Sequence, residues 1–415
     1  MTRYVVNPLF VFLAVWGCAA GFYVAGLHTG LFPPSEPFAL GLVLLNVATF
    51  SLGYLTWNTF LRLRPQDTDA EFSSGVALTP ERLRRALRVT LAFGVVAFLL
   101  CAARLVLVAS AYHVGLATLL SDPVLWRGRL TTYIAATVQQ TTLGSIAISI
   151  TSSIFSIGFV LLGIFLYFGR SRRRYLYVLS FLLLLIGISL LNLSRKEISV
   201  NVLFLIFSYL FMHHLYRVRP AREVVRTLVL PLAAVAFLYV VIELLLAKGA
   251  TYGPRGRLAG FLFSLYWYTA SPLGALAEFL ADREEVYALG QSLFLPIYKW
   301  LYRFHLVPPS TVALFGEKVY IPYVANVYSY LRNIYEDFGV FGVAVVPYVL
   351  GWGICAAQHG ARVLFGWLNL YLILLTLLIF SFYSYLLVSN QYYLQAAIAL
   401  VFFRFRLTDL DKAGL

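Results

Sequence analysis

The residues of this chain that are best suited to chemistry are cations placed where long apolar segments end. Arg195 and Lys196 lie in the tight turn NLSRKEIS between two such segments. Positive charge held this close to a bilayer surface lies at the level of lipid phosphates, so an anion is the natural partner. A snorkelling pair of side chains, or a local ion pair with Glu197, is the alternative interpretation.

Further cations lie in the long segment 248–337. Arg255 and Arg257 belong to TYGPRGRLAG, a stretch rich in Gly and Pro in which backbone can approach a ligand closely, and Arg332 lies near the end of the segment. Arginine stays charged and binds phosphate oxygens in a bidentate manner, whereas lysine acts as a point charge. These arginines are candidates for binding phosphate, with a solvated loop charge or a lipid head-group contact as the alternative.

Three acidic residues are candidates for general-base chemistry. Glu336 and Asp337 are adjacent near the start of an apolar segment, and Glu243 lies near the end of another. Each has a structural alternative, because Asp337 can cap the helix that follows it and Glu243 can pair with an arginine. Arg104, inside an apolar segment, must face a protein partner or a wet cavity, and a structural hydrogen bond or ion pair is the favoured interpretation.

The composition indicates that most of the chain lies in a lipid bilayer rather than in water. Of the 415 residues, 61% are hydrophobic and only 12% are charged, whereas soluble domains carry roughly 25% charged residues. Backbone groups inside a bilayer must be paired within one segment or a closed barrel, and long apolar runs without alternation favour helices. We therefore predict an all-α polytopic membrane protein. Much of the net charge of +14 follows the positive-inside bias, so no nucleic-acid partner is expected.

Ten apolar windows are long enough to span a bilayer. They cover residues 8–27, 38–60, 89–110, 143–168, 175–193, 198–215, 227–247, 338–357, 364–386 and 389–405. The first is interpreted as a span rather than a secretory signal, because it is long and only Arg3 precedes it. We expect a single membrane domain over residues 1–415, in which the segment 248–337 is a large outer loop that folds into short interfacial helices.

The distribution of arginine predicts the orientation. The connectors 62–88, 170–174 and 217–226 and the chain end at 404–406 are rich in arginine, which places them in the cytoplasm with both termini. The turn at Arg195 and the large loop then lie outside. The sequence contains no Walker loop or dinucleotide fingerprint, and its histidines and cysteines lack metal-ligand spacing, so neither a cofactor nor a metal is expected.

The segment NVYSYLRNIYEDFGVFG, residues 326–342, carries a more specific pattern. The residues that form it are Asn326, Ser329, Tyr335, Asp337, Phe338, Gly339 and Gly342. The segment resembles the Wzy-type oligosaccharide repeat-unit polymerases, also called O-antigen polymerases, in which Asn, Thr or Ser, and Tyr precede Asp-Phe-Gly and a further Gly before a span. The arginine turn SRKE and the stretch YTASPL, residues 268–273, fit in order. The resemblance covers roughly residues 175–360, and serine where threonine is usual is a mild departure.

The resemblance implies a membrane glycosyltransferase of GT-C-like architecture in the bacterial cytoplasmic membrane. Such an enzyme transfers a growing glycan from its polyprenyl diphosphate carrier to a second lipid-linked repeat unit without a cofactor, and a chain-length regulator is a further expected partner. The implied diphosphate-binding residues are Arg195, Lys196, Arg255, Arg257 and Arg332. The implied catalytic residues are Asp337, Glu336 and Glu243, and those expected to bind the sugars are Tyr268, Asn326, Tyr328 and Tyr335, with Tyr266 and Trp267 as further stacking candidates.

Two other functions share several of these features. A lipid-linked oligosaccharide flippase, or another secondary transporter, would need a charged path to the bilayer midplane and often has broken helices. An O-antigen ligase would use the same donor with a different acceptor. Cations grouped at the outer ends of spans favour a transferase over a transporter, and the Asp-Phe-Gly pattern favours a polymerase over a ligase.

Overall fold

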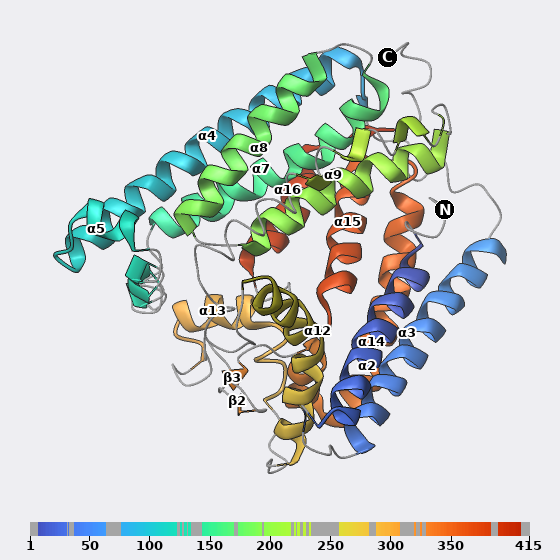
Figure 1. Ribbon diagram of the computed structural model, residues 1–415. Coiled ribbons are helices and arrows are strands. Elements are labelled where there is room, and N and C mark those ends of the chain that lie inside the picture. Colours follow the sequence, from blue (N-terminus) through green and yellow to red (C-terminus); the bar gives the residue numbers. More distant parts are fainter. Residues whose placement is uncertain are drawn as a thin grey trace.

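The protein is described by a computed structural model. The structure describes residues 7–30, 32, 37–63, 76–122, 125–126, 128–130, 132–133, 143–169, 173–192, 195–216, 220, 222–224, 227–229, 232–233, 257–281, 288–307, 319–320, 324–325, 329–382 and 389–407. These residues are mainly helical, and long helices dominate the structure (Figure 1). This agrees with the predicted all-α class, and the apolar helices are those of a polytopic membrane protein.

Within the described residues, seven helices are long and apolar enough to cross a membrane. They are α2 (Pro8–His28), α3 (Pro37–Leu63), α4 (Pro80–Ala111), α7 (Leu143–Phe168), α8 (Arg173–Asn192), α9 (Arg195–Tyr216) and α14 (Tyr330–Gly360). Each coincides with a predicted span, although several begin or end some residues away from the predicted boundary. The predicted span 227–247 lies mostly outside the described residues.

The remaining elements are shorter or lie in the predicted outer loop. They are α5 (Leu116–Ser121), α12 (Arg257–Ala281), α13 (Leu295–Arg303), α15 (Phe365–Phe380), α16 (Asn390–Phe402), β1 (Val76–Ala77), β2 (Val319–Tyr320), β3 (Val324–Ala325) and β4 (Phe405–Arg406). Helices α15 and α16 fall in the last two predicted spans. At 1.5 Å per residue they measure about 24 and 20 Å, which is less than the hydrocarbon thickness of roughly 30 Å.

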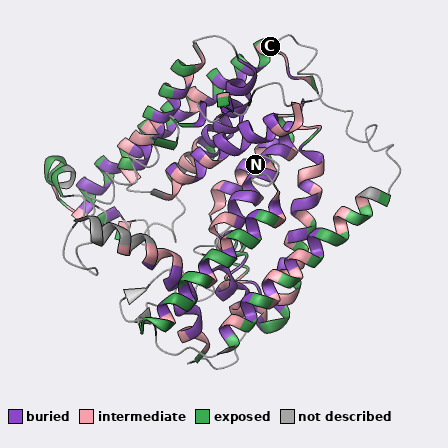
Figure 2. Ribbon diagram, turned by 45° about the vertical axis from the view of Figure 1, so that its right-hand side comes forward, coloured by how far each residue is buried: buried purple, intermediate pink, exposed green. Residues whose placement is uncertain are grey.

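The helices form two groups joined by one central helix (Figure 1). In the first group, α3 packs against α14, and α2 packs against α3 and α12. In the second group, α7 packs against α4, α9 and α16, and α8 packs against α4. Helix α15 contacts α2 and α14 of the first group and α9 and α16 of the second. Most of its residues are buried, and Figure 2 shows that buried residues follow the faces where helices meet.

Segments far apart in the sequence meet at one end of the structure, which we call the connector end. Strand β1 pairs in parallel with β4, so that Val76 lies opposite Phe405. Leu407 donates its N–H to the carbonyl of Val363 over 2.8 Å and accepts a hydrogen bond from the Tyr216 hydroxyl over 2.6 Å. All of these residues lie in or next to connectors that are predicted to be cytoplasmic. The fold thus brings together segments that were predicted to lie on the same side of the membrane.

Helix α4 begins earlier than the apolar pattern predicts. The Thr79 side chain accepts a hydrogen bond from the N–H of Arg82 over 3.3 Å, and Pro80 occupies the first turn. Serine or threonine at the N-cap followed by proline is a typical helix start. The end of the predicted connector 62–88 therefore belongs to a helix, on whose first turns the arginines lie.

Two glycines allow α3 and α14 to approach backbone to backbone. A Cβ atom on Gly53 would lie 2.0 Å from the carbonyl oxygen of Tyr348, and one on Gly351 would lie 2.3 Å from that of Phe50. Because these neighbours are backbone atoms, they cannot rotate away. Small residues at such positions are typical of helix pairs in membranes, where packing rather than the hydrophobic effect drives association.

We predict that Gly351→Ala lowers the stability of the folded protein by about 1–3 kcal/mol, the usual cost of overpacking. Gly353→Ala is the matched control, because no atom lies within 4 Å of the added Cβ in the same helix, and alanine is the better helix former by roughly 0.5–1 kcal/mol. Thermal unfolding in one detergent should separate the two variants. Equal midpoints would contradict the close contact of α3 with α14.

Candidate functional site

Helix α14 is bent sharply at Gly339. Its backbone there has φ 62° and ψ −152°, a conformation that is essentially restricted to glycine. The bend brings the two sides of the break together, because a Cβ on Gly342 would lie 2.6 Å from Cβ of Phe338 and 2.9 Å from the carbonyl oxygen of Ile334. In a straight helix residues eight apart are separated by about 12 Å. The Asp-Phe-Gly pattern thus marks the break between the two helical halves, and the predicted span 338–357 begins at this break.

The first half of α14, residues 330–338, runs against the direction of α3. The Tyr330 hydroxyl donates a hydrogen bond to the Asn46 side chain, whereas the ring of Tyr335 lies edge-on to that of Phe38, with 6.1 Å between centroids. Later residues of α14 therefore contact earlier residues of α3. This half was predicted to belong to the outer loop, but it enters the bundle.

The second half of α14, residues 340–360, runs in the same direction as α3. The Thr49 hydroxyl lies 3.5 Å from the carbonyl oxygen of Val343, and the rings of Trp57 and Trp352 are 4.5 Å apart. This half reaches the connector end and corresponds to the predicted span 338–357. The bend at residue 339 therefore lies at the opposite end of the structure, which we call the loop end.

The first half of α14 begins deep in the bundle. The N–H of Tyr330 donates to the carbonyl of Ser381 over 2.8 Å, and the Trp16 indole N–H donates to the Ser381 hydroxyl over 2.9 Å. All three residues are buried. Trp16 lies about 12 Å along α2 from the start of that helix, so the half-helix starts near mid-depth and rises to the loop end.

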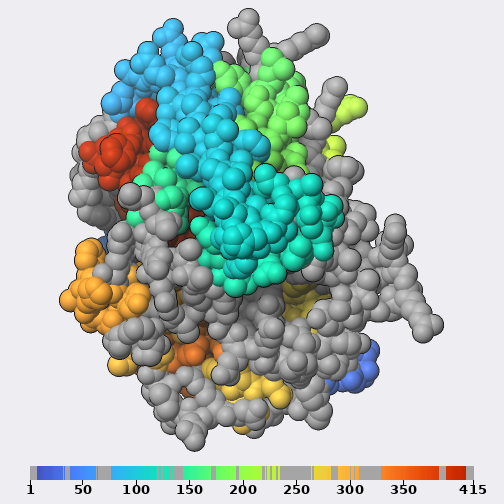
Figure 3. Space-filling model, turned by 90° about the vertical axis from the view of Figure 1, so that its left-hand side faces the viewer, coloured from blue at the N-terminus to red at the C-terminus, as the bar shows by residue number. Residues whose placement is uncertain are grey.

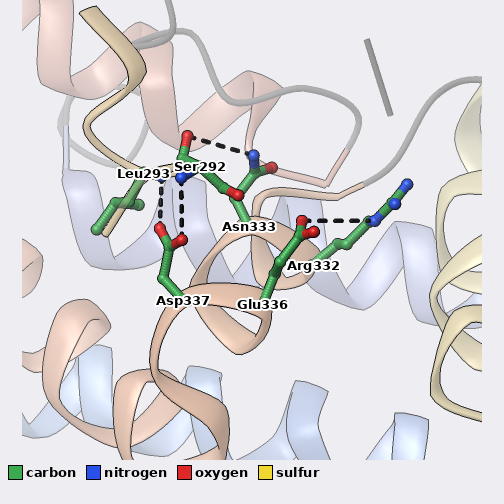
Figure 4. A network of polar contacts seen from close by, with 6 residues as sticks. All are labelled: Ser292, Leu293, Arg332, Asn333, Glu336 and Asp337. Atoms are coloured by element: carbon green, nitrogen blue, oxygen red, sulfur yellow. Dashed lines mark hydrogen bonds and ion pairs between the residues drawn. The ribbon is translucent and has the colours of Figure 1, made fainter. Parts of the chain in front are cut away.

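A clasp at the loop end holds the bend in place (Figure 4). Both oxygens of the fully buried Asp337 carboxylate accept backbone N–H bonds, from Ser292 over 2.9 Å and from Leu293 over 2.6 Å. The carbonyls of Glu336 and Asp337 accept the N–H groups of Ala288 and Leu289 over 2.9 and 3.2 Å. We call residues 288–293 with Glu336 and Asp337 the clasp.

The clasp bears on the alternative interpretation of Asp337, in which its side chain caps the helix that follows it. It also bears on whether Asp337 can act as a general base. The two backbone bonds of the Asp337 carboxylate come from the turn that leads into α13, whereas a cap would accept N–H groups from its own span. A carboxylate that is buried and accepts two backbone N–H bonds is poorly placed to remove a proton from a substrate, since geometry comes first for a general base. We therefore expect Asp337 to position the helix, and its predicted catalytic role stays a prediction, with Glu336 the more exposed of the two carboxylates.

Arg332 and Glu336 form the charged part of the site (Figure 4). They lie one turn apart on the first half of α14, with 3.9 Å between Nε of the arginine and Oε2 of the glutamate. The Arg332 side chain is 8% exposed and that of Glu336 30%, and the guanidinium lies 4.5 Å above the ring of Phe279 on α12. A largely buried guanidinium with a partly exposed carboxylate can bind an anion and accept a proton within one turn of helix.

The predicted outer loop contains one interfacial helix and one that is longer than expected. Helix α13 has apolar side chains exposed on and around it, including Phe294, Ile297 and Phe304, as an interfacial helix requires. Partial burial lowers the pKa of Lys299 on the same helix. Helix α12 has 25 residues, and it packs against α2 instead of lying over the bundle as a short helix.

Two aromatic residues of α12, Tyr266 and Trp267, make contacts within the protein. Trp267 is buried and stacks on Phe32 and Phe263, with centroid distances of 5.8 and 6.0 Å, so its ring faces are covered by protein. The Tyr266 hydroxyl donates to a carbonyl of α2 over 3.2 Å. The ring faces of Trp267 are thus occupied by Phe32 and Phe263, whereas sugar stacking by Tyr266 stays a prediction. Tyr268 is half-buried, and so is Tyr335.

The cations predicted to bind diphosphate belong to different helix groups. Arg332 lies on α14, which packs with α2, α3, α12 and α15, whereas Lys196 lies on α9, which packs with α7, α8 and α15. Arg195 and Arg257 are the first residues of α9 and α12, and their side chains lie outside the description. The predicted residues Arg255, Glu243, Asn326 and Tyr328 also lie outside the described residues.

The hydrogen-bonded role predicted for Arg104 is confirmed. Its guanidinium donates to the side-chain oxygen of Asn192 at the end of α8. Sequence reasoning missed the partners that complete the α14 site, the N–H groups of Ser292 and Leu293 and the ring of Phe279. The sequence contains little indication of the clasp turn, because its only mark is Gly290, a glycine with φ 90°.

Comparison with known protein families, characterised proteins and solved structures finds no match to this chain. Among the described residues, no group of three His, Cys, Asp or Glu side chains is arranged to hold a metal ion. The interpretation of the site therefore depends on its own geometry and on the sequence pattern around Asp337.

We predict that Asp337→Asn loosens the clasp. An amide has a single acceptor oxygen, so its NH₂ group would face a backbone N–H of Ser292 or Leu293, at a cost of about 1–3 kcal/mol for an unsatisfied buried group. Hydrogen–deuterium exchange should show faster uptake at residues 288–294. Glu336→Gln, at the neighbouring position, is the control and should leave that uptake unchanged. Wild-type protection in the Asp337 variant would contradict the clasp.

We also predict that Gly339→Ala destabilises the bend by about 1–3 kcal/mol, because alanine is strained at this φ and ψ. The effect should appear as faster amide exchange across residues 330–338 and as a lower thermal midpoint. Gly353→Ala in the second half of α14 serves as the control. A Gly339→Ala variant with native exchange would mean that the bend is absent in the folded protein.

Proposed function

We propose that this chain is a membrane glycosyltransferase that polymerises polyprenyl-diphosphate-linked oligosaccharide repeat units on the outer face of the bacterial cytoplasmic membrane. The observation that carries the proposal is the buried Arg332 guanidinium in the half-helix 330–338, one turn before Glu336. This pair lies directly beside the Asp-Phe-Gly pattern, residues 337–339, that resembles Wzy-type polymerases.

The proposed reaction needs one cation and one base at the same place. The hydroxyl of the acceptor sugar attacks the anomeric carbon of the donor, a new C–O bond forms, and the bond from that carbon to the lipid diphosphate breaks. Arg332 stabilises the negative charge that develops on the departing diphosphate. Glu336 takes the hydroxyl proton, and Asp337 holds the helix end that carries both residues. The activated donor supplies the driving force, so the proposal requires no cofactor.

The pairing of Arg332 with Glu336 suits this sequence of events. Their closest charged atoms are 3.9 Å apart, which is a loose ion pair. A diphosphate offers the guanidinium a bidentate partner, and such pairs are stronger than a single contact. Binding of the donor then draws Arg332 away from Glu336, whose carboxylate becomes free to accept a proton. We propose that donor binding activates the base in this way.

The expected orientation in the membrane also supports the proposal. The connectors rich in arginine meet at the connector end, and Arg332 and Glu336 lie toward the opposite, loop end. With the connector end in the cytosol, the site faces the side on which lipid-linked repeat units are joined. Ten spans, a GT-C-like architecture, both termini in the cytosol and a chain-length regulator as partner belong to the same proposal.

One observation favours a transporter as the second candidate. Broken helices whose half-helix N-termini lie near the bilayer midplane are a feature of secondary transporters, and the half-helix 330–338 begins at the depth of Trp16. A flippase for lipid-linked oligosaccharides would use Arg332 to bind its substrate without breaking a bond. A ligase would perform the same bond cleavage with another acceptor.

We predict that deleting the gene leaves cells with surface glycan of a single repeat unit. Complementation with Arg332→Gln or Glu336→Gln should fail to restore polymer although the protein is inserted normally, because loss of one electrostatic stabiliser costs about 10²–10³ in rate. Arg174→Gln is the control, because Arg174 lies at the start of α8 and binds the Gly169 carbonyl. Gel electrophoresis of the glycan measures the chain length.

The same experiment separates the alternatives. Polymer that accumulates on the carrier lipid would assign a ligase, and repeat units retained inside the cell would assign a flippase. Wild-type chain lengths in the Arg332→Gln strain would remove Arg332 from the mechanism.

A further inference from the structure

An exposed apolar surface lies next to the clasp, on one face of α13. It consists of the side chains of Phe294, Ile297 and Phe304, which are all exposed, and we call it the α13 face. Figure 3 shows α13, in light orange, at the surface of the molecule. Large apolar side chains that gather on one surface of a protein mark a place where something apolar binds.

The α13 face follows the period of a helix. At about 100° per residue, Ile297 and Phe304 lie within about 20° of each other around the helix axis, and Phe294 lies about 60° from Ile297. Leu295 and Pro296 point to other sides and are buried against the protein. Helix α13 thus has a buried apolar side and an exposed apolar side, and the exposed side needs a cover other than water.

The bilayer is the cover that the position of the α13 face indicates. Helix α14 is long and apolar enough to cross a membrane, and Val340 and Phe341, just after its bend, are exposed as lipid-facing residues of a span are. Phe294 and Phe338 both lie against Gly290, with ring atoms 3.1 and 3.3 Å from the place of a Cβ there. The α13 face therefore begins beside the start of a span, at the depth where an interfacial helix buries its apolar side.

Leu289, in the clasp turn, points to the same cover. Its φ is 48°, in the left-handed region that residues other than glycine rarely adopt, and its side chain is 72% exposed. Its N–H group donates to the carbonyl of Asp337, so the clasp holds its backbone while its side chain stays outside the protein. Exposure of a leucine is unfavourable in water, and contact with lipid removes that cost.

The clasp turn and α13 are joined by hydrogen bonds. Phe294 donates its N–H to the carbonyl of Gly290 over 2.8 Å, which connects the turn to the start of the helix. The Tyr298 hydroxyl, one turn into α13, donates to the carbonyl of Leu289 over 2.8 Å. A displacement of α13 therefore moves the turn whose N–H groups bind the Asp337 carboxylate.

We propose that the α13 face binds the lipid surface of the bilayer at the loop end, and that this contact holds the clasp turn against α14. The bilayer then takes part in fixing the half-helix that carries Arg332 and Glu336. The inference goes beyond the proposed function, because it concerns how the site is held and applies to transfer and transport alike.

The first test identifies what touches the α13 face. The photoreactive amino acid p-benzoylphenylalanine takes the place of Ile297 in the full chain, which is purified in nanodiscs of phosphatidylcholine and irradiated. Mass spectrometry should find phosphatidylcholine attached at this position. Lys299 is the matched control position, because it is half-buried and lies about 160° from Ile297 around the same helix. It should give at least tenfold less lipid adduct.

The second test measures the effect of the lipid contact on the clasp. In the same nanodiscs, Ile297→Ser should make amide exchange at residues 288–294 about tenfold faster, the order expected when an apolar side chain loses its cover. Ile297→Leu, which keeps the side chain apolar, should retain wild-type exchange. Phe402→Ser is the control, because Phe402 is also exposed but lies on α16, in the other group of helices.

Several results would overturn the proposal. Equal lipid adducts at positions 297 and 299, or none at 297, would show that lipid does not cover the α13 face. Attachment to a second copy of the chain or to another protein would assign the face to a protein partner. Unchanged exchange in Ile297→Ser would separate the lipid contact from the clasp. Where Ile297→Ser fails to fold, Phe304→Ser tests the same face, and wild-type exchange in that variant rejects the proposal.

Discussion

The structure of the candidate site depends on a carboxylate that is bound by backbone. Asp337 uses both oxygens to accept N–H groups from the turn before α13, and this contact fixes a helix that has been broken at Gly339. Because a broken helix leaves carbonyl groups without partners inside the fold, the clasp also supplies N–H groups to residues 336 and 337. The charged pair of Arg332 and Glu336 is held in place by these bonds, since it lies on the short helix that they terminate.

Each of the two groups of helices carries a cation away from the connector end. One is Arg332 on α14, and the other is Lys196 on α9. Helix α15 contacts both groups, is buried almost throughout and carries no charged side chain. Helix α15 therefore has no charged side chain with which to pair an ionic ligand, and the charged residues of both groups lie on the helices around it.

Much of the fold follows from apolar length, because hydrocarbon forces each long apolar segment to satisfy its own backbone. The windows at 8–27, 143–168 and 198–215 become α2, α7 and α9 with small changes at their ends. The half-helix 330–338 was not predicted, because Arg332, Glu336 and Asp337 lower its apolar character. Tertiary contacts, which the sequence does not reveal, stabilise these charged residues inside the fold. The clasp was also missed, since two backbone N–H groups leave no mark in a sequence. Arg104 was correctly predicted to be hydrogen-bonded, because an arginine inside a span must find a partner.

The anchor at Ser381 has a consequence for biogenesis. At its deep end the half-helix 330–338 contacts Trp16 of α2 and Ser381 at the end of α15. These two residues are 365 positions apart in the sequence, so the ribosome makes Ser381 long after Trp16. The contacts at the deep end of the half-helix are incomplete until then. The candidate site is therefore assembled only after α15 has been made, because Ser381 at the end of α15 anchors the half-helix that carries Arg332.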